Sequence, residues 1–254
     1  MKISNKIIIG FLAFVALNFL TSMVMLRNSL GPAGIGNGDE LVKGTGNLKT
    51  KRLAAADFRK IEIEGSFKVI LTQGEEFVEI EAEENIVDLF TARVDRKWLK
   101  IKAQEGYTLQ PNQSITIRIG FEELYKIEAF GLSTLNIPNE VTFGDVALSL
   151  HGATSLEVAN MTAQKLNVRL HGASLCTLTG RTEALEAKVS GTGKLEAEAL
   201  EASTGKVEVG GAGFANVNVT EQLHAKTNGN GTINYLGNPE VEQHRAGYSH
   251  INRK

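Results

Sequence analysis

Cysteine, proline and aromatic residues are all scarce in this chain of 254 residues. Cys176 is the only cysteine, which excludes an internal disulfide and a thiolate-rich zinc site. Four prolines and an aromatic content of 6%, with Trp98 as the single tryptophan, predict thin cores of aliphatic side chains. Glycine, in contrast, occurs 26 times. Hydrophobic residues at 42% and charged residues at 22% are typical of a folded chain rather than a disordered one.

An excess of positive charge is also missing. The 27 basic and 29 acidic residues give a formal net charge of −2, so the chain lacks the electrostatic footprint of a nucleic-acid-binding protein. Lys2, Lys6 and Arg27 lie at the amino end, which leaves 24 basic and 29 acidic residues in 28–254. The resulting charge of −5 disfavours docking of this part onto an anionic membrane surface.

Residues 7–26 form a stretch of twenty residues without a charged side chain. As a helix it would span about 30 Å, the thickness of the hydrocarbon core of a bilayer. The preceding lysines favour a cytoplasmic amino end. We therefore predict that residues 1–27 are a single-pass inner-membrane anchor and that the remaining chain lies in the periplasm. The alternative is a cleaved signal, which would leave the protein secreted or on the cell surface.

The chain after this segment divides into a tether and a folded domain. Residues 28–47 contain six glycines and Pro32 and predict a flexible tether. Residues 48–254 are expected to form one domain, which opens with alternating polar and apolar residues over 60–72, 77–82, 98–103 and 114–119. Five glutamates fall on the polar side of these strands, where alternation explains them as a solvated face: Glu62, Glu64, Glu79, Glu81 and Glu83.

A repeat of 18–21 residues begins near residue 125 and is marked by six glycines. The marker glycines are Gly131, Gly152, Gly172, Gly191, Gly211 and Gly229. Positions two and four before each marker, and four and six after it, are apolar apart from Thr227 and the phenol of Tyr235. A period of strand, glycine turn and strand is typical of a β-solenoid, in which equivalent residues stack about 4.8 Å apart. The sequence predicts an all-β solenoid with coils of about 20 residues, six of them between about 125 and 237.

Both ends of the domain carry motifs of a known family. Residues 42–74 include V-K-G-T-G-N-L and F-R-K-I-E-I-E-G-S-F-K-V-I-L-T-Q-G, and residues 228–239 read N-G-N-G-T-I-N-Y-L-G-N-P. Over about residues 42–251 the chain resembles the head GIN domain family (DUF2807), described for "putative autotransporter adhesins" of Bacteroidetes and related bacteria. The resemblance implies a right-handed β-helix and an adhesin-like role, and it brings no catalytic residues.

The repeat region is poor in the residues that β-helical enzymes use. From Gly131 onward it contains one aspartate, Asp145, and no tryptophan to stack on sugar rings. The scarcity of aspartate also argues against calcium-binding repeats. The glycine-rich runs 210–213 and 229–231 lack the Lys-Ser/Thr pair of a phosphate-binding loop. We expect neither catalytic residues nor a cofactor.

Two positions in the repeat are candidates for special chemistry. His151 and His171 stand in the same column, each directly before a marker glycine, and form a weak candidate pair for a transition metal. The adjacent members of this column are Phe130 and Ser190, so no third ligand is apparent. Cys176 falls in an inward column and is expected to be a small buried apolar residue.

The sequence leaves two hypotheses for function open. The first is a membrane-tethered, non-enzymatic interaction module of the cell envelope that binds a protein or a glycan over its solenoid face, held by residues 7–26. The second is a structural or sensory accessory of an inner-membrane protein, which acts through the transmembrane segment. The sequence does not name the ligand in either case.

Overall fold

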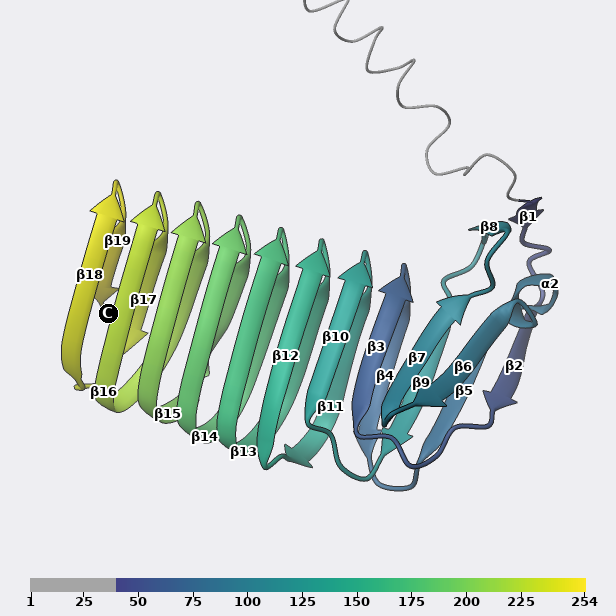
Figure 1. The fold of residues 1–254 in the computed structure, drawn as a ribbon, viewed down its shortest axis with the longest axis horizontal. Coiled ribbons are helices and arrows are strands. Elements are labelled where there is room, and N and C mark those ends of the chain that lie inside the picture. Colours follow the sequence, from purple (N-terminus) through teal and green to yellow (C-terminus); the bar gives the residue numbers. More distant parts are fainter. Residues whose placement is uncertain (1–39) are drawn as a thin grey trace, which may run out of the picture. The chain divides into compact units, whose positions relative to one another are not determined.

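The computed structural model describes residues 40–254 (Figure 1). The predicted anchor at 7–26 and the first part of the predicted tether, 28–39, lie outside the described residues. Within 40–254, no helix has the length and apolar character needed to cross a membrane.

The chain divides into two compact units. In the smaller one, β1 (Glu40–Lys43) pairs with β8 (Tyr107–Gln110) in a sheet of two strands, and the Glu40 amide donates a hydrogen bond of 2.8 Å to the Gly106 carbonyl. β1 therefore gives strand structure to the end of the segment that the sequence predicts as a tether. The larger unit comprises residues 43–104 and 111–254.

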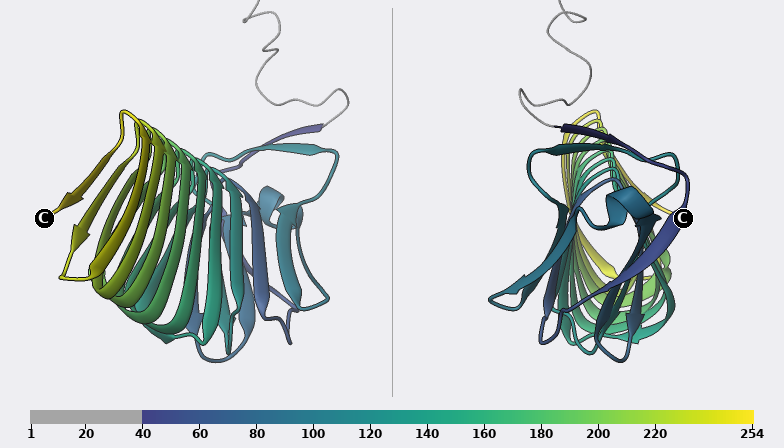
Figure 2. Two further views of the ribbon diagram at one scale, coloured as in Figure 1. Left: turned by 60° about the vertical axis from the view of Figure 1, so that its left-hand side comes forward. Right: turned by 90° about the vertical axis from the view of Figure 1, so that its right-hand side faces the viewer.

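The larger unit is an all-β solenoid, as the sequence predicts. Each coil has a first arm, which ends at a marker glycine, and a second arm, which follows the turn (Figures 1 and 2). The strands are β10 (Lys126–Gly131), β11 (Thr134–Thr142), β12 (Asp145–Gly152), β13 (Ser155–Gly172), β14 (Leu175–Gly191), β15 (Lys194–Gly211), β16 (Phe214–Gly229), β17 (Thr232–Leu236), β18 (Glu240–Gly247) and β19 (His250–Arg253). Adjacent coils pair in parallel, and their marker glycines lie in register.

The stack extends beyond the predicted repeat at both ends. β3 (Lys60–Gly65) and β4 (Lys68–Gln73) pair in parallel with β10 and β11, which places Gly65 beside Gly131. At the other end, Gly247 of β18 lies beside Gly229. The first of these coils is not part of the sequence repeat, because more than sixty residues separate Gly65 from the next marker glycine.

The residues between β4 and β10 close the amino-terminal end of the stack. They form β5 (Phe77–Glu83), the short helix α2 (Glu84–Val87), β6 (Phe90–Asp95), β7 (Trp98–Ala103) and β9 (Thr116–Phe121), and β2 (Leu48–Leu53) joins them. Here β2, β5 and β9 pair antiparallel, as do β6 and β7, while β9 and β7 pair in parallel with the first coil. Antiparallel strands thus end the parallel stack.

The core of the repeat region includes the four inward columns that the sequence identifies. Their apolar members are buried, Thr227 is buried as well, and Tyr235 is half-buried. The Thr227 hydroxyl donates a hydrogen bond of 2.7 Å to Ser249 Oγ, so this buried polar group is paired. Cys176 is fully buried, and its strand partners are Leu156 and Leu195. The predicted register of this coil is confirmed.

The corner of each coil requires glycine for two reasons. Gly152 has a φ of +87°, a conformation that side chains with a Cβ rarely adopt. A Cβ at this position would also lie 2.6 Å from the carbonyl oxygen of Gly131 on the preceding coil. Each coil therefore needs a glycine at its corner, and this requirement produces the glycine period of the sequence.

Candidate binding surfaces

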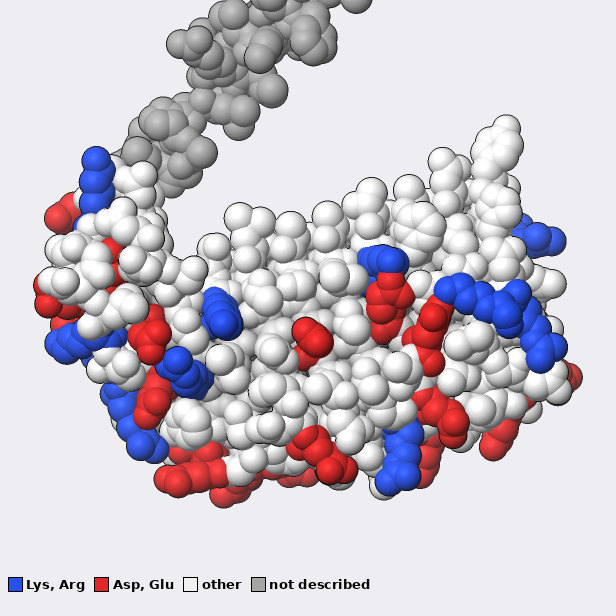
Figure 3. All heavy atoms as spheres, turned by 180° about the vertical axis from the view of Figure 1, so that it is seen from behind, with Lys and Arg blue, Asp and Glu red and all other residues white. Residues whose placement is uncertain are grey.

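An edge with almost no charged side chains runs along the glycine corner of the solenoid. We define the corner ridge as two sets of residues. The first set stands directly before and after each marker glycine from Gly131 to Gly247. The second set stands three positions after each marker and comprises Thr134, Ser155, Leu175, Lys194, Phe214, Thr232 and His250. The residues directly before and after the markers are Phe130, Leu132, His151, Ala153, His171, Ala173, Ser190, Thr192, Gly210, Ala212, Asn228, Asn230, Ala246 and Tyr248. None of them is Asp, Glu, Lys or Arg, although 22% of the chain is charged. Figure 3 shows this edge in white at the top, above a face with red and blue side chains.

The predicted histidine pair lies on this ridge as part of an aromatic stack. The rings of His151 and His171 are 4.8 Å apart at an interplanar angle of 9°, and Phe130 stacks on His151 at 4.6 Å. Stacked rings direct their in-plane nitrogen lone pairs along nearly parallel lines rather than toward one shared ion. Burial, and then the neighbouring His171, lowers the pKa of His151 below 6.5. This geometry favours a neutral stack.

Another pair of histidines shares one carboxylate on the outer surface. Glu242 accepts from His244 Nε2 at 3.2 Å and contacts His224 Nδ1 at 2.7 Å, and these hydrogen bonds lower its pKa. All three side chains are exposed. Among residues 40–254, no cluster of three or more His, Cys, Asp or Glu side chains is arranged to hold a metal ion.

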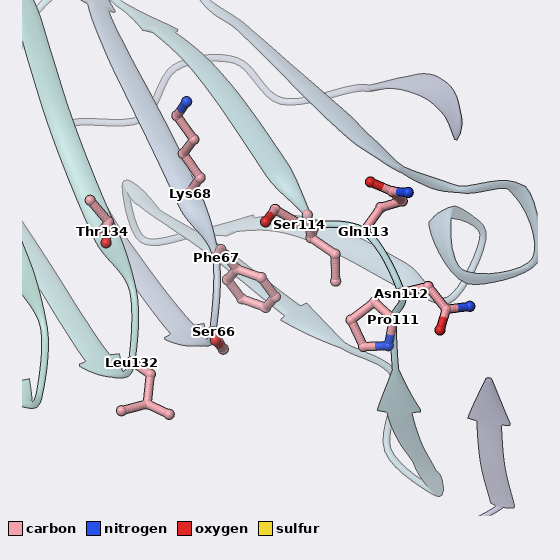
Figure 4. Close-up of a pocket in the computed structure, with 10 residues that line it drawn as sticks. Ser66, Phe67, Lys68, Pro111, Asn112, Gln113, Ser114, Leu132 and Thr134 are labelled. Carbon is pink, nitrogen blue, oxygen red and sulfur yellow. The ribbon is translucent and has the colours of Figure 1, made fainter. Parts of the chain in front are cut away.

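A groove of about 530 Å³ lies beside the first turn of the solenoid (Figure 4). Its lining combines apolar surface with hydroxyl and amide groups: Ser66, Phe67, Lys68, Pro111, Asn112, Gln113, Ser114, Ile115, Leu132 and Thr134. In Figure 4, Phe67 extends toward Pro111 at the centre, Lys68 and Gln113 lie along one rim, and Leu132 lies at the opposite rim. Lys68 is the only charged residue of the lining. The groove fits a polar ligand that has an apolar face.

A buried carboxylate fixes the loop that forms one wall of this groove. Glu83 is 1% exposed and accepts hydrogen bonds from the amide of Asn112 at 2.9 Å and from that of Gly46 at 2.6 Å. The Asn112 side chain donates to the Gly44 carbonyl over 2.7 Å. The expectation that Glu83 belongs to a solvated face is therefore wrong. Alternation along β5 does not show that the segments at 44–46 and 111–113 cover the end of this strand.

Sequence reasoning did not find the groove, because its walls come from segments far apart in the chain. The turn at 66–68, the loop at 111–115 and the turn at 132–134 contribute the lining. Phe67 occupies the corner position that Ser133, Thr154 and Ser174 occupy in later coils. The bulky ring of Phe67 at this position distinguishes the coil beside the groove from these later coils.

The described residues form a β-solenoid with an exposed ridge and a groove, so the chain belongs to the structural class of β-solenoid proteins. The family model described as "Putative auto-transporter adhesin, head GIN domain" matches residues 57–239. The chain therefore belongs to the head GIN domain family, which the motifs at both ends of the domain predict.

Solved structures share this fold. A "putative adhesin" from Bacteroides fragilis is 23% identical with a TM-score of 0.78, and the match covers 84% of this chain and all of that one. A "putative lipid binding protein" from Parabacteroides distasonis is 20% identical with a TM-score of 0.69, over 85% of this chain and all of its own. A "putative adhesin" from the same species is 21% identical with a TM-score of 0.69 and the same coverage. A search of curated proteins gave no match.

Proposed function

We propose that this protein is a non-enzymatic, membrane-tethered binding module of the cell envelope, with the groove beside Phe67 as its binding site for an envelope protein or glycan. The observation that carries the proposal is the lining of the groove. The lining combines the apolar side chains of Phe67 and Leu132 with hydroxyl and amide groups, and it contains no carboxylate to serve as a general acid or nucleophile. The adhesin-like description of the family supports binding as the activity.

The amino-terminal sequence supports the proposed tether and location. The charge-free segment at 7–26 would hold the protein in the inner membrane, with the solenoid in the periplasm. The coils would wind right-handed, as nearly all connections between parallel strands of one sheet do. A cleaved segment would instead release the same binding module from the inner membrane.

Site-specific photo-crosslinking in intact cells tests the proposed binding site. A photoreactive residue at Gln113 is expected to give discrete adducts with an envelope protein or glycan, whereas one at the exposed Glu183, outside the groove lining, gives none. Ser114→Trp should abolish these adducts because the indole fills the groove. Thr220→Trp, an exposed position on another part of the solenoid, is the matched control.

The outcomes separate the proposal from its alternatives. Equal adducts at both positions, or adducts that survive Ser114→Trp, would show that the groove is not the binding site. Adducts to an integral membrane protein that form only through residues 7–26 would favour the alternative role as an accessory of that protein. Amino-terminal sequencing of the mature protein tests the anchor separately, and a start after residue 26 contradicts it.

A further inference from the structure

We propose that the corner ridge contacts the surface of a zwitterionic lipid bilayer, so that the tethered solenoid lies with its glycine edge on the membrane. This inference rests on the membrane tether of the proposed function. It concerns a surface distinct from most of the groove, with Leu132 at the boundary between the two.

Exposed large hydrophobic side chains concentrate on this ridge. Of the seven in residues 40–254, four lie on it: Leu132 at 65% exposure, Leu175 at 40%, Phe214 at 45% and Tyr248 at 88%. They come from coils distributed along the ridge from Gly131 to Gly247. Leucine, phenylalanine and tyrosine are the residues that partition into the interface between headgroups and acyl chains.

The scarcity of charged residues on the ridge favours a lipid surface without net charge. The positions flanking the markers carry no charged residue, and the outward positions three residues later carry only Lys194, which pairs with Glu196. Contact with zwitterionic lipid would therefore desolvate few charges. The net charge of −5 of residues 28–254 disfavours an anionic surface.

Backbone amides along this edge already donate hydrogen bonds within the solenoid. At successive corners, the amides of Ala153, Ala173 and Thr192 donate to marker carbonyls of the preceding coils at 2.8–3.0 Å. The buried hydroxyls of Thr154 and Ser174 donate within their own turns at 2.8 and 3.0 Å. Loss of water from this edge therefore leaves few unpaired donors, which lowers the free-energy cost of contact with lipid.

Shape and tether favour a planar partner. The corners stack in register and form an extended edge, which can contact a flat surface at many points, whereas a globular protein would need a long matching groove. Residues 27–39 reach at most about 45 Å when fully extended, so an inserted anchor keeps the solenoid near the bilayer. This proximity raises the effective concentration of lipid and allows individually weak contacts to persist.

Depth-dependent fluorescence quenching with the full chain tests the inference. An environment-sensitive label is attached at Ala173→Cys in a Cys176→Val background, and the protein is incorporated into phosphatidylcholine vesicles that contain spin-labelled lipid. We expect several-fold stronger quenching at this position than at Glu221→Cys, an exposed control away from the ridge. Adding Ala153→Asp and Ala212→Asp should remove the difference, because two carboxylates on the ridge oppose contact with lipid.

Equal quenching at both positions, or none at either, overturns the inference. A ridge label that is shielded from aqueous iodide by envelope extract, but is not quenched by lipid, would indicate a protein partner and also overturns it. Carbonate extraction of the same samples reports on the anchor alone. An extracted protein contradicts the tether of the proposed function, while the quenching ratio still decides whether the ridge contacts lipid.

Discussion

Cys176 provides a direct test of the solenoid register, because its reactivity depends on the inward orientation of one column. Its side chain is fully buried between Leu156 and Leu195 of the adjacent coils. Burial raises the pKa of the thiol from 9.0 to about 12. At pH 8 this shift alone lowers the thiolate fraction about a thousandfold, since each pKa unit is a factor of ten.

The thiolate is the species that reacts with disulfide and maleimide reagents. We therefore expect native protein at pH 8 to be labelled at least about a thousandfold more slowly than protein in denaturant. The measurement is the time course of thiol labelling with and without urea. Labelling of the native protein within tenfold of the denatured rate would show that Cys176 faces solvent and that the register of this coil is wrong.

The same burial sets the sign of the alkaline pH dependence. Above pH 9 the unfolded thiol ionises while the folded one stays protonated up to about pH 12, so stability falls with rising pH in this window. The slope contributed by this group is about 1.4 kcal/mol per pH unit. Cys176→Val should remove this contribution at little cost, because valine is also small and apolar. Cys176→Asp should destabilise the fold by several kcal/mol, since an unpaired carboxylate enters the core. Urea unfolding of the three proteins at pH 7 and pH 10 measures both effects.

Three further predictions concern the corner, the loop and the ridge. Gly152→Ala should lower the free energy of unfolding by about 2 kcal/mol or more, because this position has a positive φ and a Cβ would clash with the preceding coil. The control Gly144→Ala should change the free energy of unfolding by less than about 0.5 kcal/mol, since a Cβ there meets no other atom. Equal urea midpoints for the two variants would contradict this prediction. Glu83→Gln should cost about 1.5–3 kcal/mol, because it weakens the hydrogen bonds from the amides of Gly46 and Asn112, and it should increase proteolysis of the loop at 111–115. His151 binds its proton less readily when folded, so stability should fall as pH drops below 6.5, and His151→Phe should reduce this loss in acid melts. An unchanged acid slope in that variant would argue against the neutral stack.

The repeat region was predictable because one short period governs both its backbone and its core. Every coil places an apolar side chain at the same distances from its marker glycine, and the columns stack in register as expected. The positive φ of the markers explains why this residue type recurs. The column that holds His151 and His171 was identified in the same way, and the structure adds their parallel stacking.

The periodic pattern gave no information where the chain leaves the period. In the sequence, β5 to β9 stand between the coil formed by β3 and β4 and the next coil, although the two coils pair directly in the fold. Glu83 follows the alternation of a solvated strand, yet segments distant in the chain cover it, and the amides of Gly46 and Asn112 donate hydrogen bonds to its carboxylate, which fixes the groove wall. Neither fact is encoded by neighbouring residues.

The all-β class, the length of the coil and the inward columns could be predicted from the sequence because each depends on local alternation or on a repeated glycine, and the motifs at both ends predicted the family. Long-range packing sets where the first coil joins the stack, how Glu83 holds the loop, and which exposed side chains meet on one edge, so these features are seen only in the folded chain. Leu132, Leu175, Phe214 and Tyr248 are far apart in the chain and belong to one ridge only because the coils stack in register. Such a surface forms only when several coils stack, because each coil contributes only a few of its side chains.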